Sequence, residues 1–104
     1  MTLVDSGFKI DGFQIDGVTV IVVQGEVDRA AAPLLRATVD TLGPDEHVYV
    51  DCAGVGFVDA EGLDALCEMA HRNVRAGGPL HVHASGALRD SIELNGVGHL
   101  FVLD

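Results

Sequence analysis

The chain has 104 residues, of which 48% are apolar, and it carries 16 Asp and Glu against six Lys and Arg, for a net charge of −10. This length predicts a single domain over residues 1–104, with a core that needs no disulfide or metal staple. Because phosphate contacts require a basic face, the charge argues against nucleic-acid binding. No apolar run reaches the roughly 18 residues of a membrane span, and no basic segment precedes an apolar one. We therefore expect no anchor, no signal peptide and a cytoplasmic location.

The first elements are predicted from alternation and turn residues. Residues 7–11 read Gly-Phe-Lys-Ile-Asp and are nearly repeated at residues 12–16. Their alternating apolar side chains predict a strand, and the break in phase at Gly12 predicts a bulge or bend. The dipeptide at 16–17, Asp-Gly, is typical of a tight hairpin turn. The apolar run over 18–23 then predicts a strand covered on both faces.

The rest of the chain alternates between helical and strand patterns, bounded by Gly, Pro and Ser signals. The expected elements are a helix from about Pro33 to Gly43-Pro44, a strand over 48–52, a helix over 60–76, a strand over 80–84, a helix capped by Ser85, and a strand over 100–103. The order β-β-α-β-α-β-α-β predicts an α/β fold, with a mixed sheet that begins in a hairpin and packs against helices.

The predicted helix over 60–76 has an apolar stripe that we expect to be buried. Its members are Leu63, Leu66, Cys67, Ala70 and Val74. The loops after Gln24 and Cys52 should open on the same edge of the sheet, where sites in α/β proteins tend to lie. We therefore expect Asp28 to be a neighbour of the turn formed by Asp59 and Glu61.

Three carboxylates mark the stretch over 51–63. Asp51 ends a strand and is expected to fix the following loop through backbone hydrogen bonds. Asp59 is placed to cap the next helix, with Glu61 in its first turn, where the helix dipole favours negative charge. The three acids also fit a recognition surface or a Mg²⁺ site for phosphoryl transfer. Against the Mg²⁺ site, the sequence has no Gly-rich phosphate loop, no suitably placed Lys and no evident base.

The two cysteines and two of the five histidines have alternative interpretations. Cys52 and Cys67 are expected to be small core residues, because free cysteine is among the most buried residue types. The alternative is a redox pair, which requires Cα atoms within about 7 Å of each other. His81 and His83 share one face of a strand and would form half of a metal site, but no third ligand lies close in sequence. We expect neither a metal nor a cofactor.

Several segments together resemble the STAS domain, and in particular the bacterial anti-sigma factor antagonist. The matching segments are Gly25-Glu-Val-Asp28, Asp51 to Leu63, Arg75 to Leu80 and Leu94 to Phe101. The resemblance implies a STAS fold and a regulatory domain that is not an enzyme. Its implied partner is an anti-sigma factor with a serine-kinase-like fold, and the domain itself is expected to be a monomer or weak dimer. Implied partner-binding residues are Asp28, Asp59, Ala60, Glu61, Gly62 and Leu63.

The chain departs from that family at the phosphorylation switch. Glu61 stands at the position matching the serine that the anti-sigma factor phosphorylates, and Ala60 stands at the preceding hydroxyl position. Glutamate has one charge and no transferable hydroxyl, so Glu61 is a partial phosphomimic that a kinase cannot modify. It either weakens docking permanently or meets a matched partner surface, or it is simply a favourable acid at a helix start. A structural STAS module in a stress-signalling assembly, or a transporter accessory, is the alternative function.

Overall fold

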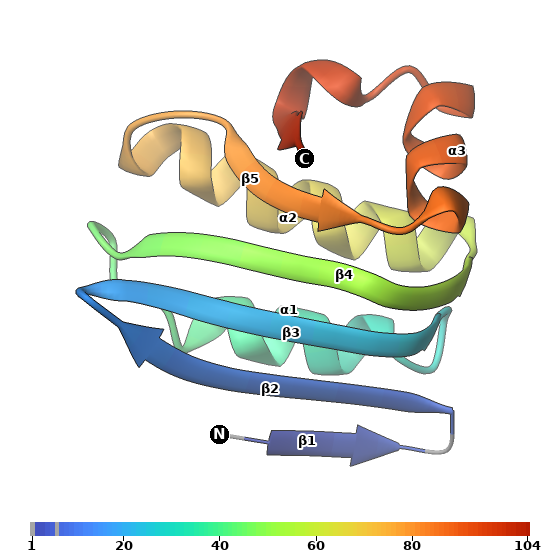
Figure 1. Cartoon of the computed structure of the whole chain (residues 1–104), viewed down its shortest axis with the longest axis horizontal. Coiled ribbons are helices and arrows are strands. Elements are labelled where there is room, and N and C mark those ends of the chain that lie inside the picture. The colour runs from blue at the N-terminus through green and yellow to red at the C-terminus, as the bar shows by residue number, and fades with distance from the viewer. Residues whose placement is uncertain (1, 6) are drawn as a thin grey trace.

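The computed structural model describes residues 2–5 and 7–104, which form one six-stranded sheet with its helices (Figure 1). The strands are β1 (Thr2–Asp5), β2 (Phe8–Ile15), β3 (Val18–Val27), β4 (His47–Val58), β5 (Leu80–Ala84) and β6 (Phe101–Leu103). The helices are α1 (Ala32–Asp40), α2 (Ala60–Ala76), α3 (Gly86–Leu94) and the short 3-10 helix η1 (Gly98–Leu100). Strand order in the sheet follows the chain, with β1 to β3 antiparallel and β3 to β6 parallel.

The predicted mixed α/β fold is confirmed, but the first strand was not predicted. Residues 2–5 form β1, which pairs with residues 8–11 of β2 and turns the expected hairpin into a three-stranded meander. The bulge expected at Gly12 is wrong, because β2 and β3 pair in unbroken register from Phe8↔Gly25 to Ile15↔Val18. The register shifts lie instead between β3 and β4. The sequence changes phase at Gly12 because the later apolar residues of β2 lie on the opposite face.

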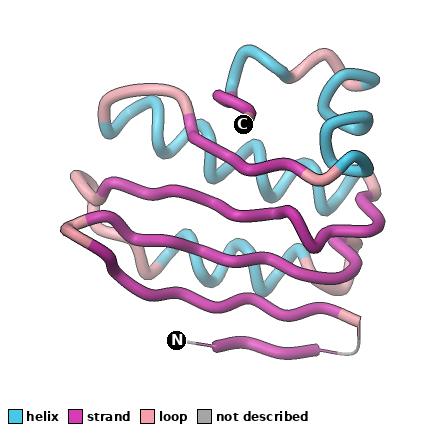
Figure 2. The backbone as a smooth tube through the Cα atoms, viewed as in Figure 1, coloured by secondary structure: helices cyan, strands magenta, loops and turns pink. Residues whose placement is uncertain are grey.

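Helices cover only one face of the sheet. Figure 1 shows α1 and α2 behind the strands, and Figure 2 shows the same face in front as strand alone. This follows from the strand order: each crossover moves one strand further in the same direction, and right-handed crossovers then place their helices on one side. The prediction that 18–23 is covered on both faces is therefore wrong. Ile21 and Val23 are buried, whereas Val20 and Val22 are only half-buried.

β4 is longer than its apolar run indicates. The strand was expected to end at Cys52, with a Gly-containing loop to the next helix, but it continues to Val58. Its pairing with β5 ends at Cys52, and residues 54–58 pair with β3 alone. Glycine has low strand propensity, so the local sequence around Gly54 and Gly56 did not predict that the strand continues. The continuation depends on pairing with β3. The extension brings the end of β4 to the end of β3.

α2 packs against α1 as well as the sheet, which shifts its buried side. Leu63, Leu66 and Ala70 are buried as predicted, and so are Ala65 and Met69, which were not predicted. Cys67 is only half-buried, and the prediction for Val74 is wrong, since 50% of its surface is exposed. On a helical wheel, the observed buried side of α2 is rotated from the predicted one, away from Cys67 and Val74 and toward α1. Among the helices of residues 7–104, none is long and apolar enough to cross a membrane.

Candidate functional site

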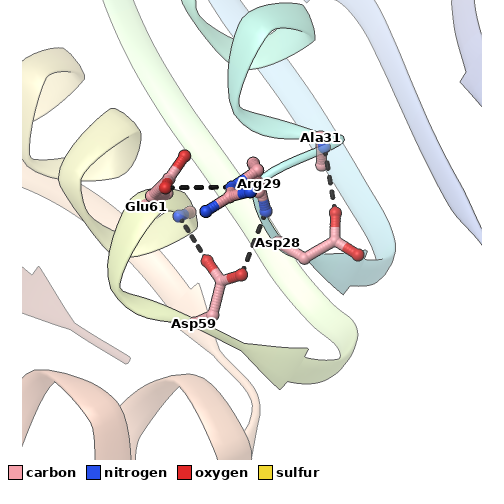
Figure 3. Close-up of polar contacts among 6 residues, drawn as sticks. Asp28, Arg29, Ala31, Asp59 and Glu61 are labelled. Carbon is pink, nitrogen blue, oxygen red and sulfur yellow. Dashed lines mark hydrogen bonds and ion pairs between the residues drawn. The ribbon is translucent and has the colours of Figure 1, made fainter.

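Asp59 joins two loops at the carboxyl edge of the sheet. It is the N-cap of α2, and its Oδ1 accepts a hydrogen bond from the Gly62 N–H at 2.8 Å. Its Oδ2 accepts from the backbone N–H of Arg29 at 3.0 Å, in the loop that follows β3 (Figure 3). Its own N–H donates to the Val27 carbonyl at 3.1 Å. The predicted cap is confirmed, and the same carboxylate holds the β3–α1 loop against the start of α2.

Asp28 lies beside this turn, but its hydrogen bonds are to backbone groups of its own loop. Its Oδ1 accepts from the Ala31 N–H at 3.0 Å, while its carbonyl accepts from Ala31 and Ala32 (Figure 3). Its carboxylate thus supports the entry to α1, where the N-terminal N–H groups need acceptors. The expected closeness of Asp28 to the turn is confirmed. The link between the two loops runs through Arg29.

Arg29 is a charged residue of this site that sequence reasoning missed. Its Nε lies 3.1 Å from Oε1 of Glu61, although the two residues are 32 apart in the chain. Both side chains are accessible, Arg29 at 83% and Glu61 at 50%. The available signal was composition, because Arg29 is the sole Lys or Arg within residues 24–31 and 51–64. Glu61 is thus a charge-compensated acid, not an isolated one.

The six residues expected to bind a partner divide into surface and support. Ala60 and Glu61 are exposed, and Asp28 and Asp59 are half-buried. Gly62 and Leu63 are buried and cannot form the surface themselves.

Gly62 is where α2 touches β3. A Cβ built there would lie 1.9 Å from the Val27 carbonyl oxygen. Glycine is therefore required for the close approach, and Gly62 and Leu63 position the turn from beneath.

Phe57 is an exposed aromatic residue close to this turn in the chain. It lies two residues before Asp59, pairs with Glu26 of β3, and has 50% of its surface exposed. Buried aromatic anchors carry much of the binding energy in protein interfaces. We define the docking turn as Arg29, Phe57, Asp59, Ala60 and Glu61.

The three carboxylates of the central stretch do not converge. Asp51 accepts a hydrogen bond from the Ala53 N–H at 3.0 Å, which confirms its predicted role in fixing the next segment. Asp59 lies eight positions further along the chain, about 26 Å away at the usual rise of a strand. Within residues 2–5 and 7–104, no group of three or more His, Cys, Asp or Glu is arranged to hold a metal ion, and this includes His81 and His83. The Mg²⁺ alternative has no geometric support.

Both cysteines are free thiols. Cys52 is fully buried, as predicted, and burial, followed by the charge of Asp51, raises the pKa of its thiol to about 12. Burial, followed by the charges of Asp64 and Glu68, also raises the pKa of the half-buried Cys67. A redox cysteine needs a lowered pKa, because the thiolate is the reactive form. These environments oppose the redox alternative.

A mixed sheet with helices on one face and an acidic turn at its carboxyl edge is the α/β architecture of the STAS class. The chain belongs to the STAS domain family, since the family model described as "Mlab, STAS domain" matches residues 12–103. The resemblance expected from the sequence is therefore confirmed. A search of curated proteins found no match.

Fourteen solved chains match this structure. One is an anti-sigma factor antagonist from Mycobacterium paratuberculosis, with a TM-score of 0.76 and 26% identity over 92% of this chain and 84% of that one. Another is the anti-sigma factor antagonist SpoIIAA in its unphosphorylated form, with a TM-score of 0.63 and 17% identity over 84% and 82%. At that identity the second match supports the fold alone.

Proposed function

We propose that this chain is a cytoplasmic anti-sigma factor antagonist that docks on an anti-sigma factor without a serine phosphorylation switch. The match at 26% identity to a solved anti-sigma factor antagonist supports the general kind of function. The partner in this proposal has a serine-kinase-like fold, as the resemblance implies. The observation that carries the proposal is an exposed Glu61 in the first turn of α2. The family resemblance implies a phosphorylatable serine at this position.

The pairing of Glu61 with Arg29 favours a binding-competent state over a permanently weakened one. A phosphoserine adds about −1.5 to −2 charges and three acceptor oxygens at neutral pH. Glu61 adds one charge, and the guanidinium 3.1 Å away compensates it. In net charge, the Arg29–Glu61 pair therefore resembles an unmodified serine more closely than a phosphoserine. An exposed pair contributes little to stability, so its main effect is on the charge that a partner meets.

Phe57 supplies a contact that is independent of charge. With 50% of its surface exposed, it would insert into an apolar recess of the partner. An aromatic side chain within a polar rim is the usual arrangement of an interface hot spot. We therefore assign affinity mainly to Phe57, and discrimination to Arg29 and Glu61.

Calorimetry against the anti-sigma factors of the same organism tests the proposal. Wild type should bind one of them, and Arg29→Ala should weaken binding by exposing the uncompensated charge of Glu61. Replacing both residues, Arg29→Ala with Glu61→Ser, should restore much of the affinity. Arg36→Ala is the matched control, because Arg36 pairs with Glu68 between α1 and α2 at 2.7 Å and lies outside the docking turn.

Absence of measurable binding to every anti-sigma factor, with or without nucleotide, would contradict the proposed function. It would favour the alternative of a structural STAS module in a larger assembly or beside a transporter. Adjacent anti-sigma or transporter genes would separate these two functions independently of any binding measurement.

A further inference from the structure

A groove between α1 and α2 gathers three of the six Lys and Arg residues of this acidic chain. We define the arginine groove by Arg36 of α1 and by Arg72 and Arg75 of α2, which line it. The two helices pack against each other on the helical face of the sheet (Figure 1). The groove has a volume of about 570 Å³, which is in the range of small-molecule sites.

Arg72 has a charged group without a partner. Its Nη2 donates a hydrogen bond to the carbonyl of Gly43, in the loop after α1. Its Nη1 is buried and, among residues 2–5 and 7–104, it is the one buried side-chain nitrogen or oxygen that meets no hydrogen-bond partner. Buried polar groups nearly always have such a partner, and a buried charge without one is costly. An acceptor that comes from outside the chain would satisfy this group.

The other two arginines also keep donors free, since a guanidinium has five N–H groups. Arg36 uses its Nε on Glu68, at 2.7 Å, which leaves its two Nη groups. Arg75 lies in the last turn of α2, where a cation suits the helix dipole, and it makes no hydrogen bond or ion pair with any residue that the structure describes. The arginine groove therefore presents planar N–H forks, which match the oxygens of phosphate and carboxylate groups.

Acidic side chains reduce the positive charge of the arginine groove without cancelling it. Asp40 and Glu68 line it together with the three arginines, so three positive and two negative charges leave one positive charge. Glu46 lies outside the groove and accepts hydrogen bonds from Thr19 at 2.6 Å and from the Gly43 N–H at 3.1 Å. On a chain whose net charge is −10, this local excess favours a small anion in the groove over most of the surface.

We propose that the arginine groove binds a small phosphate monoester with an apolar body. The phosphate accepts hydrogen bonds from Arg72 and Arg75, and its three terminal oxygens use more of the available donors than the two of a carboxylate. A bare phosphate would fill only part of the groove. The apolar body lies on Val39, Leu42 and Pro44, which line the remainder. This site is distinct from the docking turn, which lies at the start of α2.

Phenyl phosphate is the probe, and inorganic phosphate and phenol each carry one half of its chemistry. In NMR titrations of the whole chain, phenyl phosphate should shift the amides of residues 36–43 and 68–75. Solvent screens charges in an open groove, so we expect a dissociation constant on the order of 1 mM. Inorganic phosphate and phenol should each bind at least about fivefold more weakly. Added salt should weaken the binding of phenyl phosphate.

Three variants separate the groove from the net charge of the chain. Arg75→Gln should weaken binding of phenyl phosphate by at least about fivefold, and because Arg75 is exposed and unpaired among the described residues, the fold should be kept. Asp40→Asn should tighten binding by about two- to threefold, because it removes a negative charge from the groove. Arg89→Gln is the matched control: it removes one positive charge from α3, where Arg89 donates to the Asp104 carbonyl at 2.9 Å. Circular dichroism checks that all variants are folded.

Three outcomes would overturn the proposal. The first is an absence of shifts in residues 36–43 and 68–75 at about 20 mM phenyl phosphate, well above the expected dissociation constant. The second is phenol or inorganic phosphate binding as tightly as phenyl phosphate, which would leave only an apolar hollow or only an oxyanion site. The third is an equal loss in Arg75→Gln and Arg89→Gln, which would assign the effect to net charge. The titrations contain no anti-sigma factor, so their failure is independent of the proposed function.

Discussion

Replacing Gly62 by alanine should disrupt the junction between α2 and β3. The new Cβ would lie 1.9 Å from the Val27 carbonyl oxygen and 2.8 Å from its Cγ1, so the helix start must move by more than an ångström. The displaced carbonyl is also the acceptor for the Asp59 N–H at 3.1 Å. Movement of the turn would further stretch the contact between Asp59 and the backbone of Arg29.

The magnitude follows from three contributions. Overpacking a well-filled site costs about 1–3 kcal/mol, and two weakened hydrogen bonds cost about 0.5–1.5 kcal/mol each. The better helix propensity of alanine offsets up to about 1 kcal/mol. We therefore expect a net loss of about 3 kcal/mol in the free energy of unfolding, a large share of the total for a small domain.

Urea unfolding followed by circular dichroism measures this change. Gly56→Ala is the matched control, because a Cβ at Gly56 would meet no atom within 4 Å. That variant should stay within about 0.5 kcal/mol of wild type, as surface substitutions usually do. If Gly62→Ala were as stable as Gly56→Ala, the close approach of α2 to β3 would not hold α2 in place, and the geometry assigned to the docking turn would be wrong.

Three further perturbations test other contacts. Asp59→Ala should lower the free energy of unfolding by about 1–2 kcal/mol, because it removes the cap of α2. Chemical denaturation measures this loss, and an unchanged midpoint would contradict the role of Asp59 in holding the β3–α1 loop against α2. Hydrogen bonds from Thr19 and then Gly43 lower the pKa of Glu46 below 4.5, so its carboxylate stabilises the fold above that pH and this contribution is lost on acidification through the lowered pKa. Glu46→Gln should therefore flatten the acid side of the stability–pH curve, and an unaltered acid limb would refute this. The hydrogen bond from Tyr49 to Asp104, with burial, raises the pKa of the Tyr49 phenol from 10.0 to about 12. Its contribution is therefore complete below pH 10 and lost between pH 10 and 12, and Tyr49→Phe should remove that dependence in alkaline unfolding curves; an identical slope in both proteins would contradict it.

The elements that could be predicted from sequence are those with local signals. The bounds of α2 and β5 and the caps Asp59 and Ser85 match the structure, because capping residues, Gly-Pro stops and apolar periodicity act within a few residues. The closeness of Asp28 to Glu61 was also predictable, since parallel strands place their following loops at one edge.

The features that could not be predicted depend on pairing between distant segments. The extension of β4 through Gly54 and Gly56 exists because β3 lies beside it, and its local composition indicates a loop. The uncovered face of β3 depends on strand order, which the sequence does not encode locally. The ion pair of Arg29 with Glu61 joins residues 32 apart, and their contact becomes visible only when the two loops are placed together.

The proposed absence of a phosphorylation switch is tested most directly by measuring affinity for the cognate anti-sigma factor with and without ATP. For wild type, we expect the same affinity in both conditions, because Glu61 has no hydroxyl to modify. For Glu61→Ser, ATP should add a phosphate to the new serine and release the complex. An ATP-dependent loss of wild-type binding, or a Glu61→Ser variant that binds but is never phosphorylated, would contradict the role assigned to Glu61.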